Sequence, residues 1–106
     1  MKPNIQVIRP SGILDSTQAH QFRSEVSEAV DQGSRVILID LKDVTFMDSS
    51  GLAALVLALK TVRSVNGKFC VCSINDQVKM LFELTSMTRV FEIFDSPEEF
   101  SKTLED

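Results

Sequence analysis

The 106-residue chain carries eleven Lys and Arg against fifteen Asp and Glu, which gives a net charge of −4, and 43% of its residues are hydrophobic. This composition is typical of a single soluble domain with one core. The acidic balance disfavours direct nucleic-acid binding and docking on anionic membranes, because both draw affinity from basic patches. No stretch is long and apolar enough to span a bilayer, and the first residues lack an apolar export region, so we expect a cytoplasmic protein.

Strand-like and helix-like patterns alternate along the whole chain. Runs rich in β-branched and apolar residues predict strands at residues 5–9, 35–41, 68–74 and 89–94. Capping residues followed by apolar positions at helical spacing predict helices that begin near residues 15–17, 49, 75–76 and 95–97. Residues 13–14 are expected to form a short bridge, and residues 42–46 a turn.

The alternation defines the fold class. Strands that alternate with helices imply crossover connections and parallel pairing. We therefore predict one α/β domain over residues 1–106, with a mostly parallel or mixed sheet of about four strands and about four helices in the order βαβαβαβα.

Two cysteines, Cys70 and Cys72, flank Val71 in an expected strand and should point to the same face of it. A disulfide between them would close a strained tight ring. A metal site would need further ligands, and His20 is the only histidine. Small buried core residues are the better interpretation, and neither a metal nor a cofactor is predicted.

The segment from Met47 to Leu52, with the sequence Met-Asp-Ser-Ser-Gly-Leu, is the one place where polar groups cluster at an expected strand-to-helix junction. A serine there can cap the helix, or it can carry a phosphate that the positive end of the helix dipole tolerates. Nucleophilic catalysis would need a base, and His20 lies on another expected helix. The Gly-x-Ser-x-Gly elbow and the glycine-rich phosphate loops are also absent, so no catalytic residue and no enzyme activity are predicted.

The helix that follows this segment is apolar around much of its circumference. Its core stripe is expected at Leu52, Leu55, Val56, Leu59 and Val62. The remaining small and apolar positions, Ala53, Ala54 and Leu57, predict a partner surface, with close packing of the alanines as the alternative. No Lys or Arg occurs between Asp43 and Lys60, so a phosphate in this segment would repel an acidic or apolar partner.

Residues 44–52 closely resemble the phosphorylation segment of the bacterial anti-sigma factor antagonists, which belong to the STAS domain family. Residues 12–15 resemble the Gly-x-Leu-Asp loop of that family, and residues 36–41 resemble its central strand. Residues 78–82, followed by 84–85, resemble its third helix. The resemblance therefore extends over nearly the whole chain.

The resemblance implies a partner switch. The unmodified antagonist would bind an anti-sigma factor and free a sigma factor, the anti-sigma factor would act as a serine kinase that uses ATP, and a serine phosphatase would remove the phosphate. The modified residue would be Ser49, directly after Asp48, and the choice of Ser49 over Ser50 rests on the resemblance alone. The predicted partner-binding residues are Asp15, Met47, Asp48, Ser50, Gly51, Leu52, Ala53, Ala54 and Leu57.

One departure from the family concerns the start of the chain. Family members often have an additional strand there, whereas only residues 1–4 precede Ile5. An open sheet edge and weak edge-to-edge homodimers are expected as a result. Because one fold can carry unrelated functions, the alternative hypothesis is a scaffold that does not switch, or a module of the same fold that binds a lipid or nucleotide.

Overall fold

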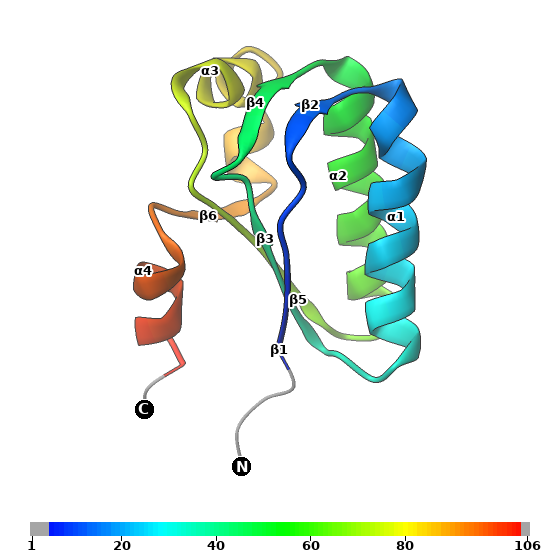
Figure 1. The fold of residues 1–106 in the computed structure, drawn as a ribbon. Coiled ribbons are helices and arrows are strands. Elements are labelled where there is room, and N and C mark those ends of the chain that lie inside the picture. Colours follow the sequence, from blue (N-terminus) through cyan, green and yellow to red (C-terminus); the bar gives the residue numbers. More distant parts are fainter. Residues whose placement is uncertain (1–4, 105–106) are drawn as a thin grey trace.

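A four-stranded parallel sheet forms the centre of the protein (Figure 1). The computed structural model describes residues 5–104. The strands of the sheet, in spatial order, are β1 (Ile5–Ile8), β3 (Val36–Asp40), β5 (Lys68–Cys72) and β6 (Glu92–Phe94). Every neighbouring pair is parallel, so the predicted α/β class and the parallel sheet are confirmed.

A second, two-stranded sheet lies at the carboxyl end of the main sheet, at the top of Figure 1. Its strands, β2 (Gly12–Leu14) and β4 (Val44–Met47), pair in parallel with a register shift between Gly12 and Ile13. The expected bridge at 13–14 was therefore wrong, and the expected turn at 42–46 is limited to Lys42 and Asp43, because β4 already begins at Val44. Strands of three and four residues are too short to show a clear period of two, and their pairing joins segments far apart in sequence.

All four helices begin where the capping residues predicted. The helices are α1 (Ser16–Asp31), α2 (Ser49–Arg63), α3 (Asp76–Leu84) and α4 (Pro97–Lys102). The residue before each helix accepts a hydrogen bond from a first-turn backbone N–H, and these caps are Asp15, Asp48, Asn75 and Ser96. Each cap satisfies a donor that has no partner within its helix, which fixes where the helix starts.

The last strand is shorter than predicted. Ser86 has a left-handed backbone, with φ at 60°, and a 3-10 turn follows it at η1 (Met87–Arg89). The chain enters the sheet only at Glu92, because Phe91 first packs into the core against the rings of Phe69 and Phe82.

The main sheet is covered on both faces. Helices α1 and α2 pack side by side on one face, and α4 lies on the other (Figure 1). The α4 face buries Leu38, Cys70 and Cys72 beneath Phe100. Both cysteines are buried free thiols on one face of β5, as predicted.

The strand β1 forms one edge of the main sheet. The expected absence of a preceding strand concerns residues 1–4, which lie outside the described residues. Gln6 and Val7 are exposed on β1, and Val7 is one of the exposed large apolar side chains. Weak homodimerisation through this edge remains a prediction.

The two thiols should be chemically inert in the folded protein. Burial, together with the Glu92 carboxylate at 3.4 Å, raises the pKa of the Cys70 thiol to about 12, and burial also raises the pKa of Cys72. Because the thiolate is the reactive form, we expect no reaction with Ellman's reagent at mildly alkaline pH in the native state. Both thiols should react once the protein is unfolded in guanidinium chloride, and rapid labelling of the native protein would contradict the prediction.

Candidate functional site

The start of α2 is capped by a carboxylate rather than by a serine hydroxyl. The Oδ1 atom of Asp48 accepts hydrogen bonds from the backbone N–H groups of Ser50 at 2.9 Å and Gly51 at 3.0 Å. Ser49 is the first residue of the helix, and its side chain is exposed. The helix therefore starts without help from the Ser49 hydroxyl, which leaves that hydroxyl available to chemistry from outside.

A glycine brings the first turn of α2 against the end of β2. A Cβ atom on Gly51 would lie 2.2 Å from the carbonyl oxygen of Leu14 and 2.9 Å from Cγ of Met47. The backbone N–H of Asp48 also donates to the same Leu14 oxygen at 3.4 Å. This close approach places Asp15, which follows Leu14, at the same end of the domain as Ser49.

Asp15 has a fixed local role. Its Oδ1 atom accepts hydrogen bonds from the hydroxyl of Thr17 at 2.6 Å and from the Thr17 backbone N–H at 3.0 Å. The hydroxyl contact is the main cause that lowers the pKa of the Asp15 carboxyl. Asp15 thus presents a negative charge while it caps α1.

The side chain of Gln77, on α3, holds the residue before the cap. Its Oε1 atom accepts from the backbone N–H of Met47, and its Nε2 atom donates to the Met47 carbonyl, both at 2.8 Å. Asn75 Nδ2 also donates to the carbonyl of Val44 at 3.1 Å. Helix α3 therefore fixes the outer side of β4, so Ser49 follows a strand that is bonded on both sides.

The role of Gln77 was not predictable, because its contact with Met47 spans 30 residues and no local pattern indicates it. An exposed apolar pair on the small sheet was not predicted either. Ile13 and Phe46 are register partners in the small sheet, with relative exposures of 52% and 46%. Each is followed by a buried residue, Leu14 or Met47, but the strands are too short for the sequence alone to reveal the exposed pair.

The predicted partner-binding residues divide into two groups. Exposed or partly exposed positions are Asp15, Asp48, Ser50, Ala53 and Leu57. Buried positions are Met47, Gly51, Leu52 and Ala54. The buried four pack inside the domain and support the exposed set, and partner contact by the predicted residues remains a prediction.

Two further features of residues 5–104 bear on the predicted chemistry. No cluster of three or more His, Cys, Asp or Glu side chains is arranged there to hold a metal ion. None of the helices in this part of the chain has the length and apolar character needed to cross a membrane.

Comparisons with known proteins agree on one family. A family model described as the STAS domain matches residues 1–100. A Thermotoga neapolitana protein named as an anti-sigma factor antagonist is 33% identical over 97 residues, which covers 91% of this chain and 86% of the relative. The anti-sigma F factor antagonist of Paenibacillus polymyxa is 29% identical over 93 residues, covering 87% and 80% of the two chains.

A solved structure agrees with this likeness. The crystal structure of a Thermotoga maritima protein, also described as an anti-sigma factor antagonist, matches with a TM-score of 0.89 and 28% identity, covering 97% of this chain and 89% of the other. The names of these relatives describe regulators and not enzymes.

Proposed function

This chain belongs to the STAS domain family, and we propose on that basis that it is an anti-sigma factor antagonist whose unmodified form binds an anti-sigma factor and frees a sigma factor. The observation that carries the proposal is the exposed Ser49 directly after the capping Asp48, on a rigidly held helix start. The position offers a hydroxyl to a kinase and keeps it out of the core.

Phosphorylation of Ser49 would act on the surface rather than on the fold. The phosphate adds roughly −1.5 to −2 charges at neutral pH. The N-terminus of α2 tolerates an anion, but Asp48 lies next to it and already accepts from two of the first N–H groups. The domain keeps its shape, while a partner that buries this surface meets new charge and loses affinity through repulsion and desolvation.

The geometry supports Ser49 over its neighbour as the modified residue. Ser49 is exposed, whereas Ser50 is only partly exposed. The proposed enzymes are the anti-sigma factor itself, acting as an ATP-dependent serine kinase, and a serine phosphatase that reverses the reaction. The kinase and the phosphatase must both reach the modified hydroxyl, and the hydroxyl of Ser49 is easier to reach than that of Ser50.

The pair Ile13 and Phe46 supplies exposed apolar area on the small sheet, whose strand β4 ends two residues before Ser49. Fully burying a large apolar side chain contributes about 1.5–3 kcal/mol relative to leaving it exposed. These two side chains are about half exposed, so part of that free energy is available to an incoming protein. The proposed interface thus combines an apolar contact with a position where charge can be added.

Ser49→Asp should weaken binding to the anti-sigma factor at least tenfold, about 1.4 kcal/mol, whereas Ser49→Ala should bind like the unmodified protein. Isothermal titration calorimetry with the purified anti-sigma factor measures both. Incubation with the same protein and ATP, followed by mass spectrometry, should place one phosphate on Ser49 and none on the Ser49→Ala variant.

A matched control is Ser101→Asp, which adds the same charge to an exposed residue of α4 on the opposite face of the sheet. It should change the affinity less than twofold. Phosphate found on another residue, or an unchanged affinity of Ser49→Asp, would rule out the switch.

A further inference from the structure

A shallow groove runs between α1 and α2 and begins at Ser50, next to the proposed phosphorylation site Ser49. Its apolar lining includes Ala19 from α1 together with Ala53 and Leu57 from α2, and Ser50 lies at its start. Ala53 and Leu57 are exposed, Leu57 by 41%. The lining positions recur at three- and four-residue spacing on both helices, so the groove follows the helix axes.

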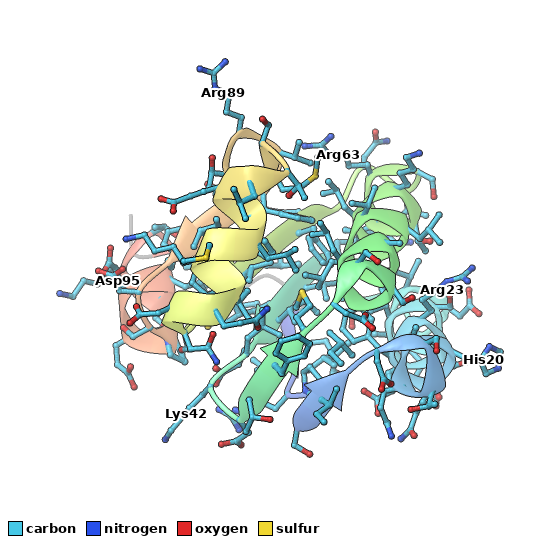
Figure 2. The ribbon with its side chains drawn as sticks, turned by 90° about the horizontal axis from the view of Figure 1, so that it is seen from above. His20, Arg23, Lys42, Arg63, Arg89 and Asp95 are labelled. Carbon is cyan, nitrogen blue, oxygen red and sulfur yellow. The ribbon has the colours of Figure 1, made fainter. Side chains whose placement is uncertain are left out.

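The groove carries a positive charge at Arg23 although the chain as a whole is acidic. His20 and Arg23 also line it, and none of the described residues in its lining is acidic. Figure 2 shows both side chains projecting from α1, with Arg23 on the side where α2 lies. The chain has fifteen acidic residues against eleven Lys and Arg. By chance alone, an acidic residue would therefore be found in the groove lining more often than a basic one.

Arg23 forms no ion pair with an acid among residues 5–104. Its neighbours three and four positions away on α1 are Ala19, His20, Val26 and Ser27. Within residues 5–104 the recorded ion pairs join Arg9 to Asp40 and Lys68 to Glu92, and neither includes Arg23. An unpaired guanidinium beside an apolar surface is suited to a carboxylate brought by another molecule.

The groove is continuous with the proposed switch. Ser49 and Ala53 are four residues apart on α2, so their side chains are neighbours on one face of the helix. A partner that covers Ser49 reaches the groove by continuing one turn along α2. A phosphate on Ser49 would then lie where the acidic side chains of that partner enter.

We propose that the groove between α1 and α2 receives an acidic amphipathic helix of the anti-sigma factor. Its apolar face packs on Ala53 and Leu57, and a carboxylate pairs with Arg23. A helix that binds in a groove contacts it through apolar side chains three and four residues apart. The residues that line this groove recur at the same spacing. This inference rests on the proposed function and adds to it the chemistry of the partner surface and a reason for its sensitivity to charge.

The test measures the affinity of the purified anti-sigma factor, identified by its phosphorylation of Ser49, for groove variants of the full chain. Arg23→Glu and Leu57→Asp should each weaken binding at least tenfold, and the loss for Arg23→Glu should shrink as salt is added. Arg23→Lys should retain most of the affinity. The control Arg89→Glu, with the same charge reversal at an exposed residue of η1, should change it less than twofold.

Thermal melting of each variant separates loss of fold from loss of binding. If the Arg23→Glu and Leu57→Asp variants were folded and bound with unchanged affinity, the groove would not be the binding site. The proposed function would survive that result as long as Ser49→Asp still weakened binding. If the unmodified protein bound no anti-sigma factor, the proposed function and the groove would both be overturned.

Discussion

Replacing Gly51 with alanine should destabilise the protein by about 3 kcal/mol or more, near the upper end of the range for overpacked sites. The new Cβ atom would lie 2.2 Å from the Leu14 carbonyl oxygen, a backbone atom that cannot rotate away. Relief requires α2 to move off the end of β2, which breaks the contact of the Asp48 N–H with that oxygen. Urea unfolding followed by circular dichroism measures the change in midpoint.

Ser50→Ala is the control for this prediction, because it alters the adjacent residue in the same helical turn without adding an atom near Leu14. Its free energy of unfolding should stay within about 0.5 kcal/mol of the original value. If Gly51→Ala were equally stable, the close approach of α2 to β2 would not exist in solution.

Replacing Gln77 with methionine should destabilise the protein by about 2–4 kcal/mol, since each unsatisfied buried polar group costs about 1–3 kcal/mol. The substitution keeps the length of the side chain but leaves the backbone N–H and C=O groups of Met47 without their partners at 2.8 Å. Met47 is fully buried, so water cannot easily replace them. Hydrogen exchange of the Met47 amide should accelerate by a larger factor than exchange in β3.

Lys79→Met introduces the same side chain at an exposed position of α3 and should change the stability by less than about 0.5 kcal/mol. Gln77→Glu keeps an acceptor for the Met47 N–H but loses the donor to its carbonyl. It should therefore fall between the methionine variant and the unmodified protein. Equal stability of all three proteins would refute the role of Gln77.

Features that depend on neighbours in sequence were predictable. Each helix start was predicted because a cap and its N–H partner lie within three residues, as with Asp48 and Gly51. The two covered faces of the main sheet followed from the unbroken apolar run that became β3. The small sheet was missed, because the pairing of Ile13 with Phe46 joins short segments across a whole helix and strand.

The same distinction applies to the site. The sequence identified the segment around Ser49 and the core stripe of α2, but it could not tell which of Ala53, Ala54 and Leu57 would be covered. Packing of α1 settles this, since it leaves Leu57 exposed while Ala54 is buried. The position of Arg23 beside Ser50 was not predictable either, because the groove is formed by two helices that are separate in sequence.

The residues that hold Ser49 in place are different from the exposed residues around it. This separation has a consequence for cells that contain several such proteins. Gly51 and Met47 are buried, and Gln77 is partly buried with its amide bonded to the backbone of Met47. These residues hold the helix start in place and offer little side-chain surface to a partner. Phe46, Leu57 and similar outward residues can be exchanged with little effect on the framework. Duplicated copies could therefore diverge in partner choice and run separate signalling circuits without crosstalk, while each inherits the same scaffold unchanged.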